Sequence, residues 1–169
     1  MLTDFSQIAD KLEEAFNSTA AGSWGDDDFG AWALRCFAHQ YGACAPYRAL
    51  CEARGVVPGT VARWEDVPLV PATAFKHFVF DSGGGRAEAV FQTSGTTRGG
   101  EQRGRHVVPS LSLYRASALP PLRDALLPDR DSIPVASLIP SPERAPESSL
   151  SVMVGMAVDA FASDVVWLV

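Results

Sequence analysis

The chain of 169 residues has the size of one globular domain, and its 47% hydrophobic residues are too many for an intrinsically disordered protein. Fourteen Lys and Arg against 20 Asp and Glu give a net charge of -6, which makes nucleic acid and anionic membrane surfaces unfavourable partners. No apolar stretch reaches the roughly 18 residues that a spanning helix needs, so we expect no membrane span.

Helices are expected throughout the first part of the chain, residues 1–55. Apolar residues recur at three- and four-residue steps over 2–16, again over 29–37, and in a shorter helix that Gly55 ends. The acidic run 26–28 precedes the second of these helices. We expect it to supply the N-cap and a favourable charge at the helix N-terminus, rather than a metal site.

The three cysteines, Cys36, Cys44 and Cys51, fall on the inward faces of the second and third expected helices. They form no Cys-x-x-Cys pair, and no histidine has a spacing that suits zinc. Free cysteine is among the most buried residue types, so we expect reduced thiols in the core, without chemistry of their own. The N-terminus also lacks the basic and apolar segments of a secretory signal, and together these features predict a cytoplasmic location.

The segment 56–86 is expected to connect the helical part to the rest of the domain. Pro58, Pro68 and Pro71 exclude a long helix there, and the glycine run 83–85 indicates a turn. We interpret this segment as a connection inside one domain.

The segment 87–169 alternates between strand and helix patterns. Strands are expected over 87–92, 134–139 and 164–169, and helices over 110–127 and 148–162. This order predicts the α/β class, with the N-terminal helices followed by a β-α-β-α-β unit whose parallel strands are joined by right-handed crossovers. Pro120 and Pro121 should kink or split the first of those helices.

A run of hydroxyl and glycine residues directly follows the first expected strand. Glycines allow backbone N–H groups to face a ligand, hydroxyls add donors, and the carboxyl end of a parallel strand is a common ligand position. Neither a Walker A motif nor a dinucleotide fingerprint is present. The run therefore predicts an anion or nucleotide-phosphate site made by Thr93, Ser94, Gly95, Thr96, Thr97, Arg98 and Gly99.

The segment 93–97 resembles the phosphate loop of the adenylate-forming, or acyl-activating, superfamily. Its flanks resemble the acyl-protein synthetase branch, which includes the luciferin-component ligase that activates long-chain fatty acids. In chain order these flanks are Tyr47 with Cys51 and Gly55, then 66–71, 74–76, 139–142 and 148–150. The resemblance spans roughly residues 30 to 160.

The resemblance implies ATP-dependent adenylation of a carboxylate, such as a fatty acid, with release of pyrophosphate and acyl transfer to a thiol of an acceptor protein. The loop would bind the ATP phosphates, and Mg²⁺ is expected with them. The family lysine after the loop is missing. Arg98, Arg103 or Arg105 replaces its charge, or these are solvated loop charges. Lys76 and His106 are further candidates for ligand contact, each with a structural role as the alternative. No catalytic residue is assigned.

Members of this family are more than twice as long, so we expect the chain to be one partial domain, the N-terminal part of such an enzyme and inactive alone. We expect the apolar strand at 165–169 to pair with a completing chain or a second copy. The alternative is a non-catalytic nucleotide-binding module, or a structural interaction module with a polar strand-end loop.

Overall fold

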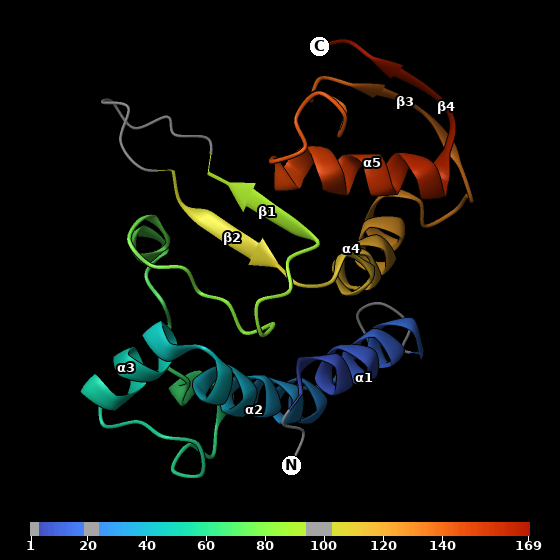
Figure 1. Ribbon diagram of the computed structural model, residues 1–169. Coiled ribbons are helices and arrows are strands. Elements are labelled where there is room, and N and C mark those ends of the chain that lie inside the picture. Colours follow the sequence, from blue (N-terminus) through green and yellow to red (C-terminus); the bar gives the residue numbers. More distant parts are fainter. Residues whose placement is uncertain (1–3, 19–23, 94–102) are drawn as a thin grey trace.

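The computed structural model describes residues 4–18, 24–93 and 103–169 and shows a mixture of helices and strands (Figure 1). The N-terminal half holds three α-helices and two short 3-10 helices: α1 Phe5–Ser18, α2 Asp26–Ala43, α3 Ala45–Ala53, η1 Trp64–Asp66 and η2 Ala72–Lys76. The C-terminal half holds β1 Ala89–Gln92, β2 Arg105–Val108, α4 Leu111–Leu126, β3 Ile133–Ser137, α5 Ser149–Phe161 and β4 Ala162–Trp167. The predicted combination of helices and strands is confirmed.

The helical part is built around a core between α2 and α3. Phe37, Cys44, Tyr47 and Cys51 are buried together, and the Phe37 and Tyr47 rings meet edge to face with centroids 6.1 Å apart. The Tyr47 hydroxyl donates to the Pro68 carbonyl oxygen at 2.9 Å and so ties the connecting segment to this core. Gly55 follows α3 with φ of 69°, a conformation that glycine adopts without strain.

The acidic run at the start of α2 does not cap the helix as predicted. The N-cap is Gly25, without a side-chain hydrogen bond, and Asp26, Asp27 and Asp28 form the first turn of the helix. The prediction of a side-chain cap is wrong because the helix begins one residue earlier than the cap would require. The three carboxylates still lie at the positive end of the helix dipole, where their charge is favourable.

Thiol labelling tests the packing of the three cysteines, which are all free. Cys44 and Cys51 are buried, in agreement with the prediction, whereas Cys36 is half-buried, and burial raises the pKa of its thiol. N-ethylmaleimide should therefore modify Cys36 first in the native protein, at a rate that rises with pH as the thiolate forms. Peptide mass spectrometry measures this order. Native labelling of Cys51 as fast as that of Cys36 would contradict the burial.

The strands form two separate pairs within the described residues. β3 and β4 are parallel, from Ile133 opposite Ala162 to Ser137 opposite Trp167, and α5 connects them as the strand-helix-strand pattern predicts. β1 pairs instead with β2, antiparallel, from Ala89 opposite Val108 to Gln92 opposite Arg105. The parallel arrangement expected for the whole β-α-β-α-β unit is thus seen for β3 and β4, whereas β1 takes the nearby strand as its partner.

The helix α4 is continuous from Leu111 to Leu126 through Pro120 and Pro121, so the expected split does not occur, while the expected kink stays a prediction. It packs against α1 on one side and α5 on the other (Figure 1). None of the helices in the described ranges is long and apolar enough to cross a membrane.

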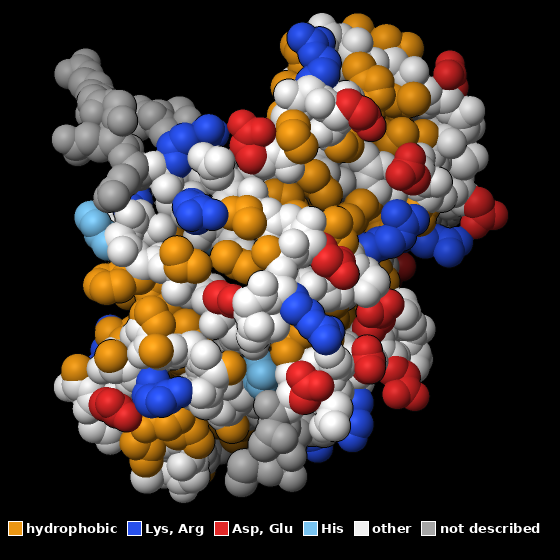
Figure 2. All heavy atoms as spheres, in the orientation of Figure 1, with side chains coloured by type: hydrophobic (Ala, Val, Ile, Leu, Met, Phe, Trp, Pro, Cys, Tyr) orange, Lys and Arg blue, Asp and Glu red, His pale blue; other side chains and the backbone are white. Residues whose placement is uncertain are grey.

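Apolar side chains remain at the surface of the β3–α5–β4 unit. Leu138 is 76% exposed, Leu168 58% and Val166 51%. Figure 2 shows hydrophobic side chains at the surface over this part of the molecule. In the described residues neither outer edge of the β3–β4 pair is bonded to another strand, so the expected pairing with a second chain stays a prediction.

Candidate functional site

The base of the predicted phosphate loop is held by an extension of the β1–β2 hairpin. The Thr93 N–H donates to the Gly104 carbonyl oxygen at 3.0 Å, and the Gly104 N–H donates to Thr93 Oγ1 at 2.9 Å. Arg103 Nε also donates to the Thr93 carbonyl oxygen, at 2.8 Å. These bonds bring together the two ends of the segment 94–102, so the chain enters and leaves it at one place.

Thr93 is the one predicted site residue that falls inside the described ranges. Its hydroxyl oxygen accepts from Gly104, which leaves the hydroxyl hydrogen available for a ligand acceptor. The other predicted residues, Ser94, Gly95, Thr96, Thr97, Arg98 and Gly99, lie outside the described residues.

Gly104 is a supporting residue that the sequence analysis missed. A Cβ at this position would lie 3.2 Å from Thr93 Cγ2, closer than most real Cβ contacts, and 3.4 Å from Phe75 Cβ. Phe75, from η2, stacks on His106 of β2 with ring centroids 4.3 Å apart and planes 25° apart. The stack gives His106 a packing role at the hairpin. In the sequence, the only indication of the role of Gly104 is that a glycine lies between Arg103 and Arg105.

The basic candidates differ in their positions around the loop. Arg103 lies at the loop base, and its Nη1 is 3.8 Å from Glu147 Oε1 in an ion pair whose side chains are each 44% exposed. Such a pair contributes little to stability in solvent, so the guanidinium can exchange Glu147 for another anion. Arg105 is exposed on β2, opposite Gln92, and Lys76 is half-buried on η2. Of these three basic residues, Arg103 is the one that hydrogen-bonds directly to the loop base, at Thr93.

The N-terminus of α5 lies beside the end of β1. The Gln92 N–H donates to the Glu147 carbonyl oxygen at 2.9 Å, and α5 begins two residues later. Ser148 caps this helix, because its hydroxyl oxygen accepts from the Ser151 N–H at 3.2 Å. The positive end of the α5 dipole therefore lies near the loop base, which favours an anion there. The negative charge of Glu147, close to the start of α5, partly offsets this effect.

The chain matches no protein-family model, no curated protein and no solved structure. The resemblance to the adenylate-forming superfamily therefore depends on the motif residues themselves. Two of the flanking residues that carry it, Tyr47 and Cys51, lie in the helical core, where packing also accounts for them. The geometry at the loop base is the independent observation, and it is suited to binding an anion.

Proposed function

We propose that the loop over residues 93–99 binds the phosphates of ATP. We further propose that the chain is the nucleotide-binding part of an AMP-forming acyl-activating enzyme, which adenylates a long-chain fatty or other carboxylate and passes the acyl group to a protein thiol. The observation that supports this most directly is the hairpin base, where Thr93 and Gly104 hold the ends of a hydroxyl- and glycine-rich segment. Positioning of this kind is what phosphate binding requires.

The charges around the loop base support a polyanionic ligand. Arg103 is held there by its bond to the Thr93 carbonyl oxygen, and its guanidinium still has donors for phosphate oxygens. The Thr93 hydroxyl and the start of α5 add a donor and a partial positive charge. In the proposed role these groups fix the phosphates while the carboxylate attacks the α-phosphorus and pyrophosphate leaves.

The proposed Mg²⁺ would neutralise phosphate charge during that step. Phosphate oxygens and water commonly supply most of its ligands, and a protein often adds one or two carboxylates. In the described ranges no group of three His, Cys, Asp or Glu side chains could hold a metal ion. We therefore assign no magnesium ligand to this part of the chain and derive no step from the metal.

The same proposal places β3 and β4 in a larger parallel sheet. A two-stranded sheet is marginal in water. Among the described residues the edges of this pair are not bonded to another strand, and such edges with exposed apolar side chains are typical of strands that have neighbours. The remaining strands would come from a completing chain or a second copy.

Calorimetry with ATP and magnesium chloride tests the phosphate-binding step. We expect Thr96→Ala to weaken ATP binding about tenfold or more, because a hydrogen bond to a charged group contributes about 1.5–3 kcal/mol. The matched control is Thr73→Ala, which removes the same groups from an exposed position on η2 and should leave the affinity within about twofold. The proposal would be wrong if the unmodified chain bound no measurable ATP, or if Thr96→Ala and Thr73→Ala had equal ATP affinities.

Exchange of labelled pyrophosphate into ATP tests the acyl-activation step separately. When this chain is assayed together with the proposed completing chain, the exchange rate should depend on a fatty acid. The Thr96→Ala substitution should lower that rate in proportion to its loss of ATP affinity. ATP binding without any carboxylate-dependent exchange would instead assign the chain to the non-catalytic nucleotide-binding alternative.

A further inference from the structure

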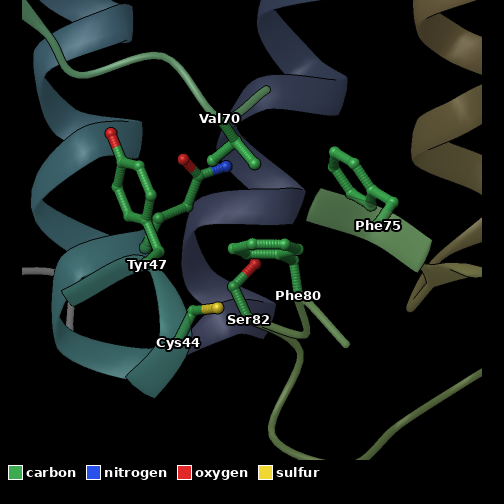
Figure 3. Close-up of a pocket in the computed structure, with 7 residues that line it drawn as sticks. Cys44, Tyr47, Val70, Phe75, Phe80 and Ser82 are labelled. Atoms are coloured by element: carbon green, nitrogen blue, oxygen red, sulfur yellow. The ribbon is translucent and has the colours of Figure 1, made fainter. Parts of the chain in front are cut away.

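A small cavity lies between the core helices and the connecting segment (Figure 3). Its volume is about 120 Å³. α2 and α3 form one side of it, and the segment 70–82 forms the other. The lining residues are Gln40, Cys44, Tyr47, Val70, Phe75, Phe80 and Ser82.

The cavity combines aromatic and aliphatic side chains with a comparable polar surface. Phe75 and Phe80 meet with ring centroids 4.9 Å apart, and the Tyr47 ring faces them while its hydroxyl points away, toward Pro68 (Figure 3). Polar groups come from Gln40, which is exposed, and from Ser82, which is half-buried. None of the described residues that line the cavity carries a formal charge.

Two hydrogen bonds, made by atoms that do not point into the cavity, keep its walls in place. On one side the Tyr47 hydroxyl holds Pro68, two residues before Val70. On the other side the ring nitrogen Nε2 of His39 lies 2.9 Å from the Ser82 carbonyl oxygen, which fixes the turn after Phe80 to α2. The cavity is therefore formed before any ligand arrives, as is usual for small-molecule sites.

We propose that this cavity binds a small uncharged molecule or group that has an aromatic ring or a branched alkyl chain and one hydrogen-bonding atom. Its volume is smaller than the roughly 150 Å³ of the enclosed apolar cavity that binds benzene, but it opens to solvent, so part of a bound molecule can lie outside it. The ring would pack against Phe75 and Phe80, and the polar atom would reach the Gln40 amide or the Ser82 hydroxyl. A carboxylate is disfavoured because none of the described lining residues carries a positive charge that would pair with it.

The cavity shares one side chain with the base of the loop. Phe75 lines the cavity and also stacks on His106, and its Cβ lies against Gly104. A ring bound beside Phe75 therefore changes the magnetic environment of His106. This makes the His106 imidazole a spectroscopic reporter of the cavity that requires no nucleotide, so the proposal can fail or succeed independently of ATP binding.

The test is an NMR titration with benzyl alcohol, with benzoate as the charged probe of the same ring. We expect saturable shifts of the Phe80 and His106 ring signals with a dissociation constant on the order of 1 mM, as is usual for so small a ligand. Benzoate should bind at least tenfold more weakly. Val70→Phe fills the cavity and should weaken benzyl alcohol at least tenfold, while Leu69→Phe adds the same ring at a neighbouring side chain that is 80% exposed and should change nothing.

Three results would overturn the proposal: shifts that do not saturate, equal affinities in Val70→Phe and Leu69→Phe, or benzoate binding as tightly as benzyl alcohol. Far-UV circular dichroism establishes that each variant is folded. If Val70→Phe is unfolded, Ser82→Leu can be used instead, because it places a larger side chain in the cavity from the turn after Phe80. This variant should also abolish the saturable shifts.

Discussion

Phe37→Ala is expected to lower the free energy of unfolding by about 3–5 kcal/mol, a typical cost of removing a buried phenylalanine. Phe37 is 2% exposed, and its ring packs edge to face on Tyr41 and Tyr47. A domain of this size is stable by about 5–15 kcal/mol, so much of its stability depends on this side chain. Urea unfolding followed by circular dichroism measures the change.

Phe78→Ala provides the matched control because it deletes the same side chain from a position that is 55% exposed. Its only described ring contact is with Phe80 at 6.3 Å, so we expect a loss below about 1 kcal/mol. Equal losses in the two variants would show that the core between α2 and α3 does not dominate the stability of the chain.

Two helical glycines should respond to alanine with opposite signs. Gly155, in α5, is buried, and a Cβ there would overlap Pro142 Cγ and lie 3.2 Å from Pro142 Cδ. The proline ring cannot turn away, so Gly155→Ala should destabilise the protein by about 1–3 kcal/mol. Gly42, near the end of α2, has no atom within 4 Å of the Cβ position. Gly42→Ala should therefore stabilise it by about 0.5–1 kcal/mol through helix propensity.

Thermal unfolding of the two alanine variants beside the unmodified chain distinguishes packing from propensity. If propensity alone governed these positions, both variants would melt at higher temperature. A raised midpoint in Gly155→Ala would mean that the Ser141–Pro142 turn does not rest on α5 as the structure shows.

Much of the helical part was predictable because its signals are local. Apolar residues at three- and four-residue steps identified α1, α2 and α3, and Gly55 identified the end of α3. The same periodicity placed Cys44 and Cys51 on buried faces. In the C-terminal half, a helix between two apolar runs predicted the parallel β3–α5–β4 unit, since a connecting helix of this length favours a parallel crossover.

The candidate site divides in the same way. The hydroxyl- and glycine-rich composition after β1 and its likeness to a phosphate loop are properties of the sequence by itself. Gly104 and Phe75 could not be identified as its supports, because their importance lies in contacts across the hairpin and with a distant 3-10 helix. The function proposed for the loop stays a prediction that the ATP titration tests.

The sequence by itself determined where the five α-helices and the strands β1, β3 and β4 form, though not β2, and where the polar run after β1 lies, because these features depend on neighbours within a few positions. Only the tertiary structure decided that β1 pairs with β2, that Glu147 meets the end of β1, and that Phe75 separates a cavity from the loop base. The physical reason is that hydrogen-bond partners and close packing depend on which distant segments come into contact, and local composition does not specify these contacts.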